Sequence, residues 1–469
     1  METNKTNPFG IKDKLGYMFG DFANNFTFML VSTVLMKFYS DVMGISVGLI
    51  GIMMMAARFV DAFTDVAMGQ LVDRSRVTKA GKFKPWILWM CGPVALASFL
   101  MYANWFANMP MGFKVFWMFF TYLLWGSVFY TSINIPYGSM ASAITSDPAG
   151  RAQLSNWRTI GSSLGGSFIG VILPVVVYYT DANGNQVLSG PKVAFFAFLC
   201  SVGAVICYLL CYFLTTERVP IEQKKEKFDL KKLLRDLAGN KALIGIVVSS
   251  ICLLFVQLTL QTMITYVYPN YFRNIAAQSA TGIAGTVITL LCAGFTVNLS
   301  QRYGRKELSI AASVFGAVLF FVALFLQIRN GWVFLIIYSI AYIGMAVFSL
   351  ICWAMITDVI DDTEVRTGER SDGTIYAVYS FARKLGQAAA SGVSGLLLTA
   401  IGYTAQTQFD PKVTQGIYNV TCLVPAIGYG LLAVALFFLY PLGRKQVEEN
   451  TEVLRRKRLQ TNEGECGKL

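Results

Sequence analysis

Long apolar stretches recur along the whole chain and are separated by short polar connections. Each stretch reaches about 20 residues or more, the length that an α-helix needs to cross the hydrocarbon core of a bilayer. The pattern predicts an all-α membrane protein with twelve spanning helices, at residues 15–40, 45–72, 85–107, 113–144, 151–179, 193–215, 242–268, 279–300, 307–328, 331–357, 373–402 and 416–442.

The composition supports a chain that lies mostly in lipid. Hydrophobic residues make up 55% of the sequence and charged residues only 14%, whereas soluble domains carry about 25% charged residues. The nine cysteines form no CxxC pattern, so we expect neither a disulfide framework nor a metal site. Histidine is absent from the sequence. Any proton pathway must therefore use carboxylates, because the usual side chain for proton transfer near neutral pH is missing.

The net charge of +12 is concentrated in connections between the predicted spans. Basic residues gather after the second span (74–84), after the sixth (224–235) and in the tail (455–458), whereas the connections 180–192 and 403–414 hold one each. Such a bias is typical of loops that stay in the cytoplasm. It predicts a bacterial inner-membrane protein with both termini in the cytoplasm, and it argues against nucleic-acid binding.

The spans divide into two sets of six around the central basic stretch. We expect an N-terminal bundle at 1–215, a cytoplasmic linker at 216–241, a C-terminal bundle at 242–442 and a basic tail at 443–469. A weak internal echo supports two related halves, because the turn Gly69–Lys84 and the turn Val297–Leu308 each follow the second span of their half.

Three charged residues share one face of the second predicted helix. Arg58, Asp61 and Asp65 are spaced i, i+3 and i+7, and a charge at mid-membrane costs about 2.5–3.5 kcal/mol on insertion scales. Two carboxylates one turn apart repel each other unless a cation lies between them. This predicts a site for a coupling cation, either H⁺ or Na⁺. The alternative is that Arg58 pairs with the aspartates as a structural contact between helices.

Other polar side chains lie within predicted spans and are suited to a sugar, because carboxylates, amides and guanidinium groups match adjacent hydroxyls while an aromatic ring covers the apolar face of the sugar ring. Asp21 and Arg158 are the first candidates. The remaining candidates are Asn25, Tyr130, Asn134, Tyr376, Ser380 and Lys384.

Several separated motifs together resemble one transporter family. The runs GYMFGDFANNF, ARFVDAFTDVAMGQLVDR, FYTSINIPYGSMASAIT, RAQLSNWR and TDVIDDTEVRTGERSDGTIYAVYSFARKLGQA occur in this order. They are similar to the glycoside–pentoside–hexuronide:cation symporters, the melibiose permease family of the major facilitator superfamily. The resemblance covers essentially the whole chain. It implies two six-helix bundles around a central cavity and solute import by alternating access.

The resemblance also assigns roles to positions in this sequence. It implies that the coupling cation is bound by Asp61, Asp65 and Thr131, with Asn134 at a position that serves both cation and sugar. It implies sugar contacts for Asp21, Arg158 and Ser380. Lys384 would link cation binding to sugar binding. Arg58, selected from the charges of the second helix, is a second candidate for coupling. The charged segment with Asp358, Asp361 and Arg366 is similar to a family signature that we interpret as a gate.

Two positions depart from melibiose permease. Asn134 replaces an aspartate, and Gly138 replaces a tryptophan that stacks on the sugar. Melibiose is therefore not the expected substrate. A site with one carboxylate fewer is less anionic, which favours a proton over sodium. Arg158, Arg383 and Lys384 also suit an acidic glycoside, although they equally balance Asp21, Asp61 and Asp65.

Other functions remain as alternatives. A lysolipid or other amphiphile carrier and a drug antiporter share the architecture, but a lipid site needs a wide apolar slot, and the first, fourth and fifth helices carry polar side chains. A membrane enzyme would need a nucleophile with its base or a metal cluster, and neither pattern occurs in the sequence. A sensor built on the same fold would use the basic linker and tail. We expect no cofactor beyond the coupling cation, contact with membrane lipid, and a monomer.

Overall fold

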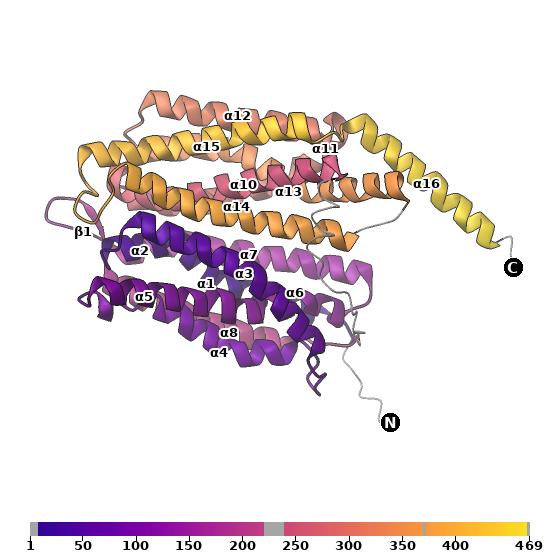
Figure 1. Ribbon diagram of the computed structural model, residues 1–469, viewed down its shortest axis with the longest axis horizontal. Helices are drawn as coiled ribbons and strands as arrows, with labels where there is room; N and C mark the ends of the chain where they lie inside the picture. The colour runs from indigo at the N-terminus through magenta and orange to yellow at the C-terminus, as the bar shows by residue number, and fades with distance from the viewer. Residues whose placement is uncertain (1–7, 220–238, 369–371, 467–469) are drawn as a thin grey trace. The chain divides into compact units, whose positions relative to one another are not determined.

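The computed structural model describes residues 8–219, 239–368 and 372–466, which are helical almost throughout (Figure 1). Before residue 216 the elements are α1 (Ile11–Leu30), η1 (Val31–Leu35), α2 (Met36–Asp41), α3 (Val47–Arg74), α4 (Lys84–Leu100), η2 (Asn104–Phe106), α5 (Met111–Leu123), η3 (Leu124–Tyr130), α6 (Thr131–Ile144), α7 (Pro148–Val177), β1 (Tyr178–Thr180), β2 (Gln186–Leu188) and α8 (Gly190–Leu214). After residue 239 they are α10 (Lys241–Tyr266), η4 (Val267–Phe272), α11 (Ile275–Tyr303), α12 (Arg305–Leu326), α13 (Gly331–Thr367), α14 (Asp372–Ala400), α15 (Pro411–Leu439) and α16 (Arg444–Cys466).

Every predicted span coincides with a helical segment. Ten segments of the described chain are long and apolar enough to cross a membrane by length and composition. The other two, α1–η1–α2 and α14, are more polar and contain candidate site residues such as Asp21 and Lys384. The polar residues that lower the hydropathy of these helices are also the residues that made them candidates for a binding site.

One helix boundary differs from the sequence expectation. Helix α13 continues to Thr367, beyond the predicted end at residue 357. The predicted tail contains helix α16, and its Asn450 donates a hydrogen bond to Asp362 of α13 at 3.1 Å. Most of the predicted linker lies outside the described residues, which resume at residue 239.

A short hairpin was also not expected from the sequence. Strands β1 and β2 pair antiparallel, with Tyr178 opposite Leu188. The turn between them is held by Asp181, whose carboxylate accepts the backbone N–H groups of Asn183 and Asn185 at 2.9 and 2.8 Å. These bonds favour the charged form and lower the pKa of Asp181, with the bond from Asn185 as the largest cause.

Local sequence explains where several helices begin. Asp147 accepts hydrogen bonds from Ala149 N and Gly150 N at the start of α7, and Asn330 accepts one from Trp332 N at the start of α13. Side-chain oxygens at these positions satisfy N–H groups that have no partner within the helix. Gly304 has a φ of +99°, a conformation that glycine adopts without strain and that lets α11 turn directly into α12.

The described chain forms two compact units. The first unit consists of Met1–Lys227, Gln261–Thr286 and Ser391–Tyr418. The second consists of Phe228–Leu260, Val287–Ala390 and Asn419–Leu469. The first unit therefore combines all of the N-terminal half with two short stretches of the C-terminal half, namely the segment around η4 and the segment from the end of α14 to the start of α15.

Close packing in the first unit depends on small residues. Helix α1 packs along α7 and α8, and a Cβ on Gly161 of α7 would collide with the carbonyl oxygen of Met18 in α1. A Cβ on Gly165 would lie 2.7 Å from the Cβ of Asn25. The glycine-rich run of α7 is thus a helix-packing surface, as small residues in membrane helices usually are. This contact holds α1 and α7, which carry the first sugar candidates, side by side.

Candidate functional site

The two aspartates of α3 face hydroxyl groups of the next helical segment. The hydroxyl of Thr131 donates to Asp65 Oδ1 at 2.9 Å and also lies 3.0 Å from the carbonyl oxygen of Gly126. Asp61 Oδ1 accepts a hydrogen bond from the hydroxyl of Ser127 at 2.5 Å. Carboxylates one helical turn apart lie about 5–6 Å from each other between Cβ atoms. The first unit therefore gathers two carboxylates, two hydroxyls and a backbone carbonyl in one small region.

Ser127 was missed by sequence reasoning. It belongs to η3, a π-helical segment at Leu124–Tyr130, and it stands four positions before the predicted Thr131. A π-helical turn widens the backbone and often occurs at functional sites. Only the adjacent pair Gly126 and Ser127, inside an otherwise apolar stretch, hinted at this, because the register of a π-helix is not visible in an α-helical pattern.

Arg58 forms an ion pair with Asp61, with its Nη1 3.3 Å from Asp61 Oδ2. The side chains of Arg58 and Asp61 are 12% and 7% exposed, and Arg58 Nε is buried without a hydrogen-bond partner among the described residues. The Arg58 guanidinium also lies 5.6 Å from the centre of the Phe28 ring. Asp61 therefore has the cationic partner that the structural alternative requires. Asp65 is more exposed and has a hydroxyl partner in Thr131.

Asp21 and Arg158, the first sugar candidates, are brought together by the packing of α1 on α7. Arg158 Nε lies 3.2 Å from Asp21 Oδ1, and the two side chains are 41% and 10% exposed. The guanidinium group also lies 5.4 Å from the ring centre of Tyr137. Tyr137 stacks on Tyr17 with ring centres 4.7 Å apart. A carboxylate, a guanidinium group and an aromatic ring thus lie together, and the Arg158 side chain is more exposed than that of Asp21.

The amide candidates Asn25 and Asn134 are hydrogen-bonded to the helix that carries Asp21 or to its neighbours. Asn25 Nδ2 donates to the Asp21 carbonyl at 2.9 Å and to Ser162 Oγ at 3.1 Å. Asn134 Oδ1 accepts from Asn24 Nδ2 at 3.4 Å, and Asn24 Oδ1 accepts from the hydroxyl of Tyr208 at 2.7 Å. Asn24 and Tyr208 were not among the predicted site residues. Asn134 therefore connects α6, which carries the cation candidate Thr131, to α1, which carries Asp21.

Tyr130 lies between the two groups of charged residues. Its ring centre lies 6.1 Å from that of Phe28 and 5.2 Å from that of Trp125. Phe28 of α1 also contacts Arg58, the ion-pair partner of Asp61. Aromatic contacts therefore connect α1 and Tyr130 to the region of Asp61. The cation candidates and the sugar candidates of the first unit are therefore neighbours in one packed region.

The candidates on α14 belong to the second unit. Tyr376 is 43% exposed, Ser380 is exposed and Lys384 is half-buried. Beside them Arg383 lies 5.7 Å from the Trp353 ring centre. Trp353 stacks on Tyr376 at 6.4 Å between ring centres. The structure thus gives α14 an exposed aromatic and polar face next to a cation.

The predicted gate residues lie on the long end of α13. Asp358 forms an ion pair with Arg305 of α12, and Arg305 also donates to the carbonyl oxygen of Ala354 at 3.2 Å. Arg366 pairs with Asp362 at 3.7 Å. Asp361 is half-buried. Arg305 and Asp362 are charged partners that the sequence analysis did not select.

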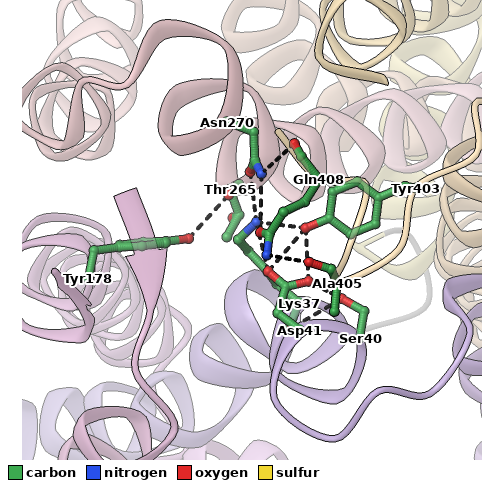
Figure 2. Close-up of polar contacts among 9 residues, drawn as sticks. All are labelled: Lys37, Ser40, Asp41, Tyr178, Thr265, Asn270, Tyr403, Ala405 and Gln408. Atoms are coloured by element: carbon green, nitrogen blue, oxygen red, sulfur yellow. Dashed lines mark hydrogen bonds and ion pairs between the residues drawn. The ribbon is translucent and has the colours of Figure 1, made fainter. Parts of the chain in front are cut away.

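A further polar cluster in the first unit was missed entirely. Figure 2 shows Lys37 of α2 surrounded by Asp41 and by residues from two distant stretches of chain, Asn270 and Tyr403. The Lys37 side chain is fully buried. The sequence signal was present, since a lysine inside an apolar helix end is unusual, but Lys37 stood near a predicted helix end, where a long side chain normally reaches water.

Comparisons with known proteins agree with one another. The family described as MFS/sugar transport protein matches residues 16–444. The chain is 31% identical to the uncharacterized symporter YjmB of Bacillus subtilis (strain 168), over 97% of each chain. It is 29% identical to the glucuronide carrier protein homolog of Escherichia coli (strain K12), over 95% of this chain and 96% of that one.

Solved structures show the same fold. The crystal structure of a D-xylose–proton symporter superposes with a TM-score of 0.65, at 14% sequence identity, and the alignment covers 92% of this chain and 98% of the other. At this identity the likeness concerns the fold alone. The all-helical fold that the sequence predicted is therefore confirmed.

Proposed function

Because the chain belongs to the MFS/sugar transport protein family, we propose that it is a cation-coupled importer of a sugar or glycoside. The family membership makes it a multi-pass membrane transporter of the major facilitator superfamily and not an enzyme. The observation that carries the proposal is the packed region of the first unit in which Asp65 and Asp61 lie near Asp21 and Arg158.

The cation site consists of Asp61, Asp65 and Thr131, with Ser127 added and Asn134 nearby. A hydroxyl group has two lone pairs, so Thr131 and Ser127 keep acceptor capacity while they donate to a carboxylate. Carboxylate, hydroxyl and carbonyl oxygens are the ligands that hard cations prefer. The same carboxylates accept a proton when no metal ion is present. Asp65 is the principal ligand, because it is more exposed than Asp61 and accepts a hydrogen bond from Thr131.

The sugar site begins at Arg158 and Asp21. Arg158 is 41% exposed, and its guanidinium carries five N–H donors, more than its bond to Asp21 requires. A solute hydroxyl or carboxylate can therefore bind Arg158 while Asp21 accepts from a neighbouring hydroxyl. Asn25 orients the site by joining the Asp21 carbonyl to Ser162, and Tyr130 supplies an aromatic surface. The glucuronide carrier protein homolog is named for an acidic sugar, which agrees with an exposed guanidinium.

The remaining assignments of the sequence analysis extend this proposal. Tyr376, Ser380 and Lys384 supply the sugar contacts of the second half, and Lys384 links them to the charge state of the cation site, with Arg58 as its counterpart. Asp358, Asp361 and Arg366 belong to a gate, in which Arg305 and Asp362 are the partners. The transporter works as a monomer in the bacterial inner membrane, with both termini in the cytoplasm.

Uptake into proteoliposomes tests the proposal. Purified protein is reconstituted, and a panel of labelled neutral and acidic glycosides is offered under an imposed Na⁺ gradient or an imposed H⁺ gradient. We expect one gradient to drive accumulation of at least one glycoside. The Asn134 position favours the H⁺ gradient, because the site has fewer carboxylates than melibiose permease. The variant Asp65→Asn serves as the control that inserts but does not accumulate.

The opposite outcome is equally informative. If no glycoside moves under either gradient, although the protein is folded and inserted, the sugar assignment is wrong. The panel is then extended to lysolipids and other amphiphiles. Movement of these compounds, with loss of movement in Asp65→Asn, would keep the cation site and replace the substrate.

A further inference from the structure

Lys37 is a buried cation with a complete set of partners. Its side chain is 0% exposed. An ammonium group has three N–H donors, and Lys37 Nζ has three oxygen partners: Asp41 Oδ2 at 3.1 Å, Asn270 Oδ1 at 2.8 Å and the Tyr403 hydroxyl at 2.9 Å. The ring of Tyr266 lies beside it, 4.6 Å from Nζ. A buried charge without such compensation would be costly, so this arrangement is specific.

Tyr403 bonds both members of the Lys37–Asp41 pair. Its hydroxyl accepts from Lys37 and lies 2.8 Å and 3.0 Å from the two carboxylate oxygens of Asp41. Asn270 is held in turn by Gln408, because Asn270 Nδ2 donates to the Gln408 carbonyl at 3.1 Å and to Gln408 Oε1 at 3.3 Å (Figure 2). The network is therefore continuous from α2 through η4 to the connection between α14 and α15.

The partners come from opposite halves of the sequence. Lys37 and Asp41 lie at the end of the first predicted span, whereas Asn270 follows the seventh and Tyr403 follows the eleventh. A second contact has the same character, since the Tyr178 hydroxyl after α7 donates to the Thr265 carbonyl of α10 at 3.2 Å. Carriers with this fold work by rocking one half against the other. Bonds that join the two halves at one end must break when that end opens.

The charges are placed so that breaking these bonds is reversible. Lys37 and Asp41 are four residues apart on the same helix, so the ion pair itself remains when the partners leave. Water then replaces Asn270 and Tyr403, which offsets much of the lost hydrogen bonding, because the gain from a buried ion pair is largely cancelled by desolvation. A purely apolar contact of this size would have no such compensation on opening. The network can therefore hold an end closed without closing it permanently.

We propose that Lys37, Asp41, Asn270 and Tyr403 form a latch that closes one end of the transport pathway and opens once in each cycle. The charge bias of the connections places this end outside the cytoplasm. The role as a step in transport rests on the proposed function, whereas the latch itself is a property of the fold that can be measured without any solute.

The test measures the accessibility of a cysteine introduced beside the latch, at the residue before Tyr266. Thr265 is 3% exposed, and the substitution Thr265→Cys leaves the carbonyl that accepts from Tyr178 in place. The reconstituted protein is treated with a water-soluble maleimide, and labelling is quantified for each cysteine-containing peptide by mass spectrometry. Cys200, a native buried cysteine of the first unit that is 3% exposed, reports general unfolding in the same sample.

Two latch variants are compared with two matched controls. Tyr403→Phe removes one hydroxyl and Lys37→Met removes one charge. Tyr102→Phe removes a buried hydroxyl that has no hydrogen-bond partner in the described part of the chain, and Lys114→Met removes an ammonium that bonds the carbonyls of Met43 and Ala107 in its own half. We expect labelling at position 265 to rise about tenfold in the latch variants and to stay within about twofold in the controls.

Two results would overturn the latch. In one, labelling at position 265 is the same in the latch variants and the controls. In the other, labelling of Cys200 rises together with position 265 and the melting temperature falls, which identifies a purely structural network. Failure of the parent protein to move any glycoside leaves both readouts intact, so an error in the proposed substrate is separated from an error in the latch.

Discussion

The region around Arg58 and Arg158 and the cluster around Lys37 differ in how fully the donors of their cations are hydrogen-bonded. Both contain a carboxylate paired with a cation inside a helical bundle. Arg158 at the middle is 41% exposed, and Arg58 has a buried Nε without a partner among the described residues, whereas Lys37 is 0% exposed with every donor satisfied. An incomplete pair can accept a ligand by rearranging its bonds. A complete pair gains nothing from a ligand and changes only when water reaches it.

This difference separates binding from closure. Asp21 and Arg158 pair with each other within the N-terminal half, so these partners stay together while the molecule changes state. The partners of Lys37 come from both halves. Substitutions in the middle should therefore change affinity and coupling, and substitutions at the Lys37 end should change accessibility.

The largest effect is expected for Asp65→Asn. The amide keeps the shape and an acceptor for Thr131 but loses the charge that the cation requires. Truncating one member of a close charge pair costs about 2–5 kcal/mol, and each 1.4 kcal/mol is tenfold, so accumulation under the driving gradient should fall by about 30-fold or more. Proteoliposome uptake measures it.

The control for this variant is Asp73→Asn on the same helix. Asp73 is 61% exposed in its side chain, so its replacement should leave accumulation within about twofold. If both variants lost accumulation equally, the loss would reflect any change of charge on α3. The assignment of Asp65 to the cation site would then be wrong.

The next largest effect is expected for Arg158→Ala. The variant loses the exposed donors and leaves Asp21, whose side chain is 10% exposed, without this cation. Solute affinity should fall by about 30-fold, from the cost of an unpaired charge, and cation binding should change much less. Isothermal titration of purified protein with solute, and separately with the cation, distinguishes the two. Arg151→Ala, an exposed arginine of the same helix, should bind solute normally.

A smaller effect is expected for Ser127→Ala. The variant removes a hydroxyl that donates to Asp61 at 2.5 Å, and a hydrogen bond to a charged group contributes about 1.5–3 kcal/mol. Cation affinity should fall about tenfold. Ser132→Ala is the matched control, because Ser132 Oγ bonds the Val128 carbonyl of its own segment at 2.5 Å. Cation titration of solute binding measures both, and indistinguishable affinities would remove Ser127 from the site.

The second unit completes the comparison. Its ion pairs include Arg305–Asp358 and Arg366–Asp362 on α12 and α13, and exposed aromatic rings stack between α13 and α14. Among the described residues, more charged side chains are buried in the first unit than in the second, where Asp358 and Asp362 are buried. This asymmetry agrees with a cation site in the N-terminal half and with a C-terminal half that contributes mainly to solute binding and gating.

The spans and the family could be read from the order of residues alone. Apolar length is a local property of the chain, and a helix in lipid satisfies its own backbone, so each span can be recognised without its neighbours. The polar residues that interrupt a span are equally visible. Asp21, Asp61, Asp65 and Arg158 were therefore selected as site candidates from the sequence, because a charge in a spanning helix is informative wherever its partner lies.

Which of these residues meet became visible only in the folded chain. The pairing of Asp21 with Arg158 depends on glycine contacts between α1 and α7, and the bond from Ser127 to Asp61 depends on a π-helical register. The Lys37 cluster joins positions more than two hundred residues apart in sequence. Periodicity along one helix carries no information about which other helix packs against it, since that choice is made by the packing of the whole bundle.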